Sequence, residues 1–396
     1  MSCADMLAEV RAGVDKFIAI RRDLHMHPEK GFDLPRTSAL VKRELESYGL
    51  EVQTGFVPCA VLGVLRTGRP GKTVAIRADM DALGMQDLKD VPYKSQNDGV
   101  CHACGHDSHT AILLGTAKYL SDHRDELKGT VKFVFQPAEE GPAPGGAKLI
   151  MESGVLDDVD VIIGAHTQPR YPAGTVIYRY NEMYGSGDFF EVHLKGVGGH
   201  AAAPQNAHDV ITTAAQIINA YQCVKARECA PMKSSVVSVC SVNAGVLSTK
   251  NVLPDELTFG GTFRTHDDAT RSYLSKRLEE VANGISALNG VKCDFKLEPL
   301  FPPFGNDNEV TDVIRQAATD VLGAEHVVEM TEPFMGSEDF AHYTKKIKAA
   351  FFLFGVGNEA KGITAYYHNP RFDVDEDAIA PTIAVMAETA KRLLGC

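Results

Sequence analysis

The sequence predicts an α/β fold in which helices cover both faces of a sheet, interrupted by a smaller α+β domain. Helical and strand patterns alternate over residues 7–164 and again over 309–394, as in chains that build such sheets. Residues 189–298 instead follow the order strand–helix–strand–strand–helix–strand, which is the order of a ferredoxin-like domain. At 396 residues, the chain is also longer than one typical domain core.

The main domain begins with two helical patterns, the second of which ends at Gly49. Short apolar runs bounded by turn residues then predict strands, with amphipathic helices between them. We expect three of these strands to end just before Asp79, Glu139 and His166. The expected elements of this part are helices at 7–26, 36–48, 107–120 and 147–153 and strands at 60–65, 73–76, 131–136 and 160–164.

The pattern changes near residue 185 and changes back after Pro299, Pro302 and Pro303, which predict a linker. We therefore expect a discontinuous main domain, made of residues 1–184 and 301–396, and an inserted domain made of residues 185–300. The elements expected in the insert are strands at 189–194, 235–242, 257–264 and 292–298 and helices at 209–223 and 269–285.

Charge and composition exclude several classes of protein. The formal net charge of −12 argues against binding to nucleic acid or to anionic membranes. No apolar run reaches the roughly 18 residues of a membrane helix, and residues 1–20 lack the apolar core of a signal peptide. The nine cysteines are an odd number and several lie in apolar patterns, so we expect reduced thiols and a cytoplasmic location.

The segment from Cys101 to His109 concentrates two thiols, three imidazoles and a carboxylate. These are the side chains that bind transition-metal ions. Further candidate ligands follow predicted strands at Glu139-Glu140 and at His166, and His368 lies beside a turn near the C-terminus. Because ligands bind outside the carboxyl ends of strands in α/β sheets, we expect these side chains to share one crevice with Asp79.

Other interpretations of the same residues remain open at this point. Cys101 and Cys104 form a C-x-x-C pair that suits a redox centre or half of a zinc ribbon, although the chain contains no second such pair. A single histidine is more often a core or surface residue, and a glutamate pair is usually a solvated turn. The coincidence of these residues at strand ends favours the metal interpretation.

The sequence resembles the two-metal aminoacylase/carboxypeptidase superfamily of metallopeptidases. Within it, the sequence is most similar to the branch of N-acyl-amino-acid amidohydrolases, hippurate hydrolases and plant auxin-conjugate hydrolases. Six motifs carry this resemblance over nearly the whole chain, and Cys-Gly-His-Asp marks the branch. The matching stretches are residues 21–29 (RRDLHMHPE), 77–83 (RADMDAL), 102–107 (HACGHD), 135–141 (FQPAEEG), 198–202 (GGHAA) and 336–340 (GSEDF).

The resemblance implies a catalytic domain of the two-metal exopeptidase type, interrupted by a lid or dimerisation domain. It implies two divalent metal ions per subunit, chosen among Zn, Mn, Co and Ni, with Glu139 as general base. Asp79 is expected to orient a ligand, and His102 and His109 to support the site from behind. The implied metal ligands are Cys104, His106, Glu140, His166 and His368.

The resemblance also implies that His200 reaches the reaction from the inserted domain of a partner subunit, within a homodimer. Asn251 and Arg264 match positions that hold the substrate carboxylate, although Arg264 could instead be a solvated strand residue. The expected reaction is hydrolysis of N-acyl-L-amino acids. The alternatives are a metallocarboxypeptidase or dipeptidase acting on short peptides, and a non-catalytic metal or redox sensor.

Three positions and one short stretch depart from the pattern of the branch. Cys101, Gln205 and Gly84 stand where the branch usually has Met, His and Pro, and residues 184–188 are richer in glycine than expected. None of these changes removes an implied ligand or the implied base. The acyl-group preference, rather than catalysis, is what they leave open, because Cys101 and Gln205 are candidates to line or support the pocket.

Overall fold

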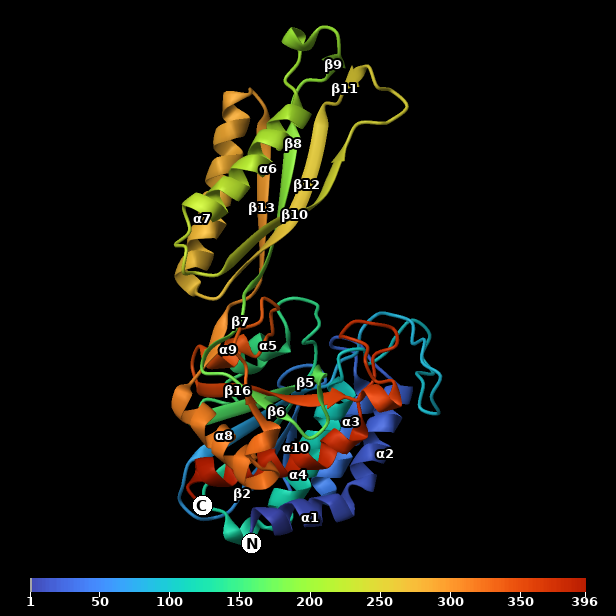
Figure 1. The fold of residues 1–396 in the computed structure, drawn as a ribbon, viewed down its shortest axis with the longest axis vertical. Coiled ribbons are helices and arrows are strands. Elements are labelled where there is room, and N and C mark those ends of the chain that lie inside the picture. Colours follow the sequence, from blue (N-terminus) through green and yellow to red (C-terminus); the bar gives the residue numbers. More distant parts are fainter. Residues whose placement is uncertain (1) are drawn as a thin grey trace. The chain divides into compact units, whose positions relative to one another are not determined.

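The computed structural model describes residues 2–396, which fold into two compact units (Figure 1). Unit 1 takes in the described residues up to Asn181, together with Gly305–Glu332 and His342–Cys396. Unit 2 takes in Glu182–Phe304 and the short segment Pro333–Ala341. The chain thus passes from one unit to the other more than once.

Unit 1 is built around an eight-stranded mixed sheet with the order β1-β2-β4-β3-β5-β16-β6-β15. Its central strands β4, β3, β5 and β16 run parallel, whereas β2 and β6 run antiparallel to their neighbours β4 and β16. The strands are β1 (Glu51–Thr54), β2 (Val61–Arg66), β3 (Thr73–Asp79), β4 (Thr130–Gln136), β5 (Val161–Pro172), β6 (Val176–Tyr178), β15 (Val327–Glu329) and β16 (Lys348–Gly357).

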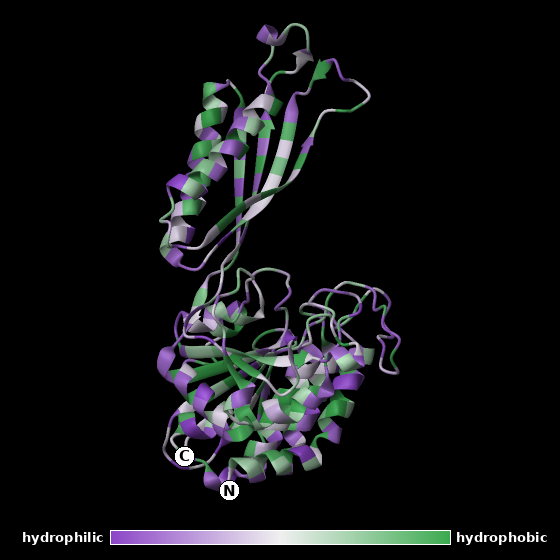
Figure 2. Ribbon diagram, in the orientation of Figure 1, coloured by the Kyte–Doolittle hydropathy of each residue, from purple (hydrophilic) through white to green (hydrophobic). Residues whose placement is uncertain are grey.

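Successive residues of the central strands are buried, which requires that both faces of the sheet are covered. Figure 2 shows the apolar character of these strands and the mixed character of the surrounding helices. Helix α4 contacts α2, α10 and β3, so it lies in the middle of the core. The helices of unit 1 are α1 (Cys3–Gly13), α2 (Asp15–Met26), α3 (Pro35–Ser47), α4 (His106–Asp122), α5 (Gly146–Glu152), α8 (Asn308–Leu322) and α10 (Ile379–Leu394), and the short α9 (Ala341–Thr344) spans the last boundary between units.

Unit 2 has the predicted ferredoxin-like order, with an antiparallel sheet arranged β10-β12-β8-β13. Both of its helices pack on one face of this sheet, around a core that includes Phe190, Tyr221 and Phe263. The elements are β8 (Gly187–Lys195), α6 (Val210–Arg227), β10 (Ser235–Ala244), β12 (Glu256–Thr265), α7 (Asp268–Leu288) and β13 (Lys292–Phe301). The predicted fold class is therefore confirmed.

Two small ribbons and five short 3-10 turns complete the chain. β9 (Gly199–His200) pairs with β11 (Val252–Leu253), and β7 (Asn181–Tyr184) pairs with β14 (Phe304–Asn306). The turns are Arg124–Glu126, Pro204–Asn206, Ala324–His326, Glu359–Lys361 and Glu376–Ala378. No helix formed by residues 2–396 is both long and apolar enough to cross a lipid bilayer.

Three expected elements differ from the structure. The strand expected at 73–76 continues through Asp79, so the prediction that Asp79 lies beyond a strand end is wrong, because β3 pairs with β4 as far as Asp79 opposite Gln136. The helix expected at 7–26 is broken at Val14, because α1 packs against α10 whereas α2 packs against α4. The strand expected to end before His166 continues to Pro172, so the prediction that His166 lies beyond a strand end is wrong. The reason is that β16 pairs with β5 past this point, with Leu353 opposite His166.

Candidate metal centre

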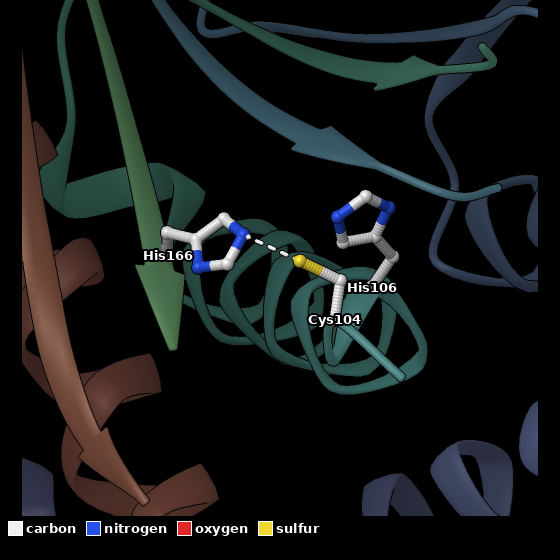
Figure 3. Close-up of side chains that lie close together, drawn as sticks. All are labelled: Cys104, His106 and His166. Atoms are coloured by element: carbon white, nitrogen blue, oxygen red, sulfur yellow. Dashed lines mark hydrogen bonds between the residues drawn. The ribbon is translucent and has the colours of Figure 1, made fainter. Parts of the chain in front are cut away.

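The loop that enters α4 places Cys104 and His106 on either side of Gly105 (Figure 3). Gly105 has a φ of 90°, and a Cβ atom there would lie 2.7 Å from Cγ2 of Thr167. Only glycine combines this backbone conformation with so close an approach to β5. The loop can therefore present two candidate ligands next to the strand that carries His166.

His166 faces Cys104, with 3.3 Å between its Nε2 and the Cys104 Sγ. Its Nδ1 lies 3.0 Å from the carbonyl oxygen of Thr167, to which it donates a hydrogen bond. This bond fixes the tautomer and leaves the lone pair of Nε2 directed at the thiol. Burial holds the pKa of His166 well below its usual value, so the ring is neutral, as a metal ligand must be.

His106 is fully buried, and neither ring nitrogen has a hydrogen-bond partner among the described residues. The ring lies 3.7 Å from a carboxylate oxygen of Asp79 and 3.5 Å from one of Asp81. Burial disfavours positive charge on His106, but these two carboxylates outweigh it and raise its pKa to about 10. The carboxylates around this ring thus stabilise a positive charge at this position.

The backbone of Glu139 and Glu140 is held by Asp81, which follows β3. Each glutamate N–H donates to a different carboxylate oxygen of Asp81, both at 3.0 Å. The chain reaches this position through Ala138, whose φ of 57° is uncommon for a residue with a side chain. Two consecutive carboxylates are therefore fixed at the end of β4.

His368 meets Glu140 from a turn near the C-terminus. Its Nε2 lies 3.0 Å from Oε1 of Glu140, and its backbone N–H donates to the carbonyl oxygen of Ala103 at 2.9 Å. The hydrogen bond to Glu140 raises the pKa of His368 above its usual value. The backbone contact with Ala103 ties the turn to the loop that carries Cys104.

Donor atoms of these residues gather in overlapping groups, within which all of them lie inside 4.8 Å. Because the groups share Cys104, His106 and Glu140, they form one continuous set large enough for more than one ion. The groups are Cys104, His106 and His166; Cys104, Glu140 and His368; and His106, Glu139 and Glu140. The structure thus brings together all five predicted ligands and the predicted base.

The chemistry of this donor set fits divalent transition-metal ions. Thiolate, imidazole and carboxylate are their preferred ligands. Burial, together with the carboxylates of Glu140 and Glu139, raises the pKa of the Cys104 thiol well above its usual value. A divalent cation reverses this effect, because it stabilises a thiolate beside carboxylates.

His109 and Asp79 contact each other next to the candidate ligand His106. Nδ1 of His109 lies 2.6 Å from Asp79, and its Nε2 accepts a hydrogen bond from the Thr167 N–H at 3.0 Å. Both ring nitrogens are therefore already engaged. Asp79 also accepts a hydrogen bond from Arg77 at 2.6 Å. His102 is buried but belongs to none of the converging groups, and burial lowers its pKa to about 3.

A buried ion network lies at the start of α4, and sequence reasoning assigned it no role. Asp107 accepts hydrogen bonds from Arg21 at 2.8 Å and from Nδ1 of His25 at 2.7 Å. Nζ of Lys89 lies 2.7 Å from Nε2 of the same histidine, and Arg21 also donates to Asp373 at 2.6 Å. Arg21, His25 and Asp107 have no exposed surface. The network fixes the residue next to His106.

Asp81 was missed as well, although it lies in the quoted RADMDAL stretch. Its signal was a second carboxylate two residues after Asp79 at the end of a strand. Arg21 and His25 were likewise visible in the RRDLHMHPE stretch. The pairing of these side chains depends on contacts between distant segments, which no local pattern encodes.

The remaining predicted residues belong to unit 2. His200 is exposed on β9, where it pairs with Val252 of β11, so it lies beside Asn251. Arg264 lies near the other end of β12. At about 3.3 Å per residue, the stretch from Glu256 to Arg264 spans roughly 26 Å. The structure therefore brings His200 and Asn251 together but separates both from Arg264.

Comparison with known proteins identifies a family and several relatives of similar sequence. The profile of peptidase family M20/M25/M40 matches residues 75–392. The chain is 41% identical to an Arabidopsis thaliana protein named IAA-amino acid hydrolase ILR1-like 4, over 96% of this chain and 86% of that one. It is 39% identical to an N-acetylcysteine deacetylase of Bacillus subtilis, over 96% and 97% of the two chains.

A third relative is thermostable carboxypeptidase 2 of Saccharolobus solfataricus, which is 38% identical over 94% of this chain and 93% of the relative. Among solved structures, the Bacillus subtilis YXEP protein is described as a dinuclear metal binding peptidase from the M20 family. It superposes with a TM-score of 0.84 at 36% identity and covers 97% of this chain and 99% of its own.

Proposed function

The chain belongs to peptidase family M20/M25/M40 and is a metal-dependent amide hydrolase, and we propose that it cleaves the amide bond of N-acyl-L-amino acids. The names of the plant hydrolase and of the bacterial deacetylase support this substrate class. The departures at Cys101 and Gln205 bear on the choice of the acyl group.

The observation that carries the proposal is the clamp formed by Asp81. By holding the peptide N–H groups of both glutamates, it fixes Glu140 beside His368 and keeps a second carboxylate, Glu139, in the same set of donors. A structural metal site or a redox sensor has no use for that second carboxylate, whereas hydrolysis needs a base.

We assign Cys104, His106, Glu140, His166 and His368 as the residues that would hold two divalent ions, chosen among Zn, Mn, Co and Ni. When bound, such ions polarise the amide carbonyl and make a water molecule acidic near neutral pH. Affinity order alone does not choose among these metals. Asp79 orients the site through His109.

Glu139 acts as the general base in this proposal. Its carboxylate takes a proton from the attacking water as the new carbon–oxygen bond forms. It then delivers that proton to the amide nitrogen as the carbon–nitrogen bond breaks. The products are a carboxylic acid and a free amino acid. The bond from its backbone N–H to Asp81 holds the main chain of Glu139 in place beside the candidate ligands.

We further propose a homodimer that associates through unit 2 and receives His200 of the partner subunit as an oxyanion donor. Strand β10 is an edge of its sheet, and Val236 and Val242 on it are exposed. An apolar edge of this kind suits pairing with a second copy. The distance between Arg264 and the His200–Asn251 pair supports the same arrangement. A single copy of unit 2 cannot bring Arg264 and this pair into contact with one small substrate, so two copies are needed.

One observation favours a second candidate function. The relative from Saccharolobus solfataricus is named a carboxypeptidase, and a short peptide shares with an N-acyl amino acid both the amide bond and the terminal carboxylate. A metallocarboxypeptidase or dipeptidase is therefore the alternative. We also propose a cytoplasmic location, which the nine free cysteines support.

Hydrolysis rates across a panel of substrates test the proposal. The panel contains N-acetyl, N-benzoyl and N-indoleacetyl amino acids beside dipeptides, with and without chelator, followed by titration of Zn, Mn and Co. We expect the acyl amino acids to be cleaved fastest and chelator to abolish the reaction. Faster cleavage of dipeptides would favour the alternative, and full activity in metal-free protein would contradict the mechanism.

A further inference from the structure

The segment Pro333–Ala341 carries Ser337 against the sheet of unit 2. Its anchor is Phe334, whose carbonyl oxygen accepts hydrogen bonds from the Gly185 N–H at 2.8 Å and from Nε2 of His266 at 2.9 Å. The Phe334 N–H in turn donates to the carbonyl oxygen of Met183 at 2.9 Å. These three bonds fix the segment beside β7, the link from β7 to β8 and the residue that follows β12.

Arg264 on β12 donates a hydrogen bond from Nη1 to Oγ of Ser337 at 3.0 Å. Among residues 2–396, this hydroxyl is the only hydrogen-bond partner of the Arg264 side chain, and no carboxylate lies within ion-pairing distance. Asp188, whose charge acts on Arg264, is already paired with Arg271 at 2.7 Å. The Nε–Nη2 edge of the guanidinium is therefore available.

A half-buried cation of this kind is unfavourable unless an anion joins it. Burial lowers the pKa of Arg264 below its usual value, and the charge of Asp188 offsets only part of that effect. The flat guanidinium fork suits a carboxylate, which it can bind through two parallel hydrogen bonds.

Gly187 provides the space in which Arg264 and Ser337 meet. A Cβ atom at this position would lie 2.6 Å from Oγ of Ser337 and 3.3 Å from Nη1 of Arg264. The backbone of Gly187 is not among those with positive φ, so an alanine would suit the local conformation. What excludes a side chain here is contact with the two partners rather than backbone strain.

We propose that Ser337 and Gly187 are positioning residues that hold the Arg264 guanidinium with its free edge open to the carboxylate of the substrate. Ser337 fixes one nitrogen of the fork, and Gly187 leaves room for that bond. The inference rests on the proposed function, because it assigns the recognition of the free carboxylate of an N-acyl amino acid to this arrangement.

The test compares an N-acyl amino acid that the wild-type enzyme cleaves with its neutral carboxamide. Ser337→Ala and Gly187→Ala are each expected to raise KM for the acid about three- to tenfold, the effect of one hydrogen bond. KM for the carboxamide and kcat for both substrates should stay unchanged. Gly284→Ala in α7 is the matched control, because a Cβ atom there meets nothing within 4 Å.

A double variant tests the role of Gly187 separately. The atom that an added Cβ would strike first is Oγ of Ser337, which Ser337→Ala removes. Gly187→Ala should therefore cost much less in the Ser337→Ala background than in the wild type, which is a measurable coupling. Independent, additive losses would contradict the spacing role. Circular dichroism and the melting temperature confirm that each variant is folded, and Ser337→Ala carries the test if Gly187→Ala is not.

Failure of the inference can be told apart from failure of the proposed function. Equal losses on the acid and on the carboxamide would show a merely structural role and overturn the inference. Wild-type enzyme that cleaves both substrates equally well would do the same while leaving amide hydrolysis intact. Wild-type enzyme that cleaves neither substrate would overturn the proposed function and this inference together.

Discussion

At the scale of single residues, neighbouring side chains of the same chemical type have different surroundings. Glu139 and Glu140 share one clamp, Asp81, yet Glu140 is paired with His368. His106 and His109 lie on the same helix, yet only His109 has both ring nitrogens in hydrogen bonds. Identity alone therefore does not assign a role, whereas the contacts of each residue do.

The glutamates give the first prediction. Glu139→Gln should keep its bound metal and its melting temperature but lose several orders of magnitude in kcat, because only proton transfer is removed. Metal content by atomic emission and turnover on an N-acyl amino acid are the measurements. Glu140→Gln is the matched control, and it should lose bound metal in addition to activity. Loss of metal from the first variant alone would reverse the two assignments.

His368 gives the second prediction. This histidine joins only Cys104 and Glu140 among the converging donors. His368→Ala should therefore weaken the ion held by that group while leaving the ion beside His106 and His166 in place. Titration of metal into apoprotein should show one tight and one weakened site. Two unchanged sites would exclude His368 as a ligand.

The candidate site was predictable from sequence where its residues lie in short motifs. Cys104 and His106 flank a glycine in one loop, and Glu139 and Glu140 follow one strand. The role of Asp81 and the engagement of His109 by Asp79 were not predictable, because the first needs β3 and β4 to lie side by side and the second needs α4 to pack against β3. Which side chains gather at the site was open to sequence reasoning, but what holds them in place was not.

At the scale of elements, apolar runs located strands better than they located strand ends. The run at 160–164 marked β5, but the strand continues to Pro172 because β16 pairs along it. The short strands β1, β6 and β15 had no recognisable pattern, since each is only three or four residues long. Pairing with a neighbour, rather than composition, determines such elements.

The ion network between α2, α4 and the C-terminal segment gives the third prediction. Burial opposes ionisation of Asp373, but Arg21 outweighs it and lowers the pKa of this carboxyl. A lowered pKa contributes stability above the ordinary value near 3.9 and loses it as the pH falls towards the folded-state value. Asp373→Asn should therefore destabilise unit 1 by about 3 kcal/mol at neutral pH, and by less near pH 3, where part of this contribution has been lost.

Urea unfolding of the wild type and the variant at both pH values measures this effect. The matched control is Asp377→Asn, which removes an exposed pairing with Lys361 and should cost less than about 1 kcal/mol. An equal cost of Asp373→Asn at both pH values would mean that the ionised pair contributes nothing and that only packing was lost.

At the scale of the whole molecule, the sequence predicted two architectures but not how their functional residues are distributed. The order of helices and strands was enough for the mixed sheet and for the ferredoxin-like sheet. It could not show that His200 lies beside Asn251, or that Arg264 lies far from both, near the end of β12. Those relations depend on the pairing of β9 with β11 and on the length of β12.

The proposed dimer gives the fourth prediction. His200→Ala should reduce kcat about 10²–10³-fold with metal content intact, as expected for loss of an oxyanion donor. Mixing this inactive variant with inactive Glu139→Gln should restore activity, because a mixed dimer has one site with both residues. Subunit exchange must first be shown with differently tagged copies. No recovery after proven exchange would place His200 in its own subunit or outside the reaction.

The separation of Asn251, which precedes β11, from Arg264, near the end of β12, also has a kinetic consequence. If each complete site draws on two chains, a lone chain is an inactive precursor, and the rate at high dilution grows with the square of protein concentration. Specific activity should then fall as the enzyme is diluted below its dissociation constant and recover on reconcentration. In a cell that makes little of this protein, the activity per chain would therefore be lower than in a cell that makes much of it.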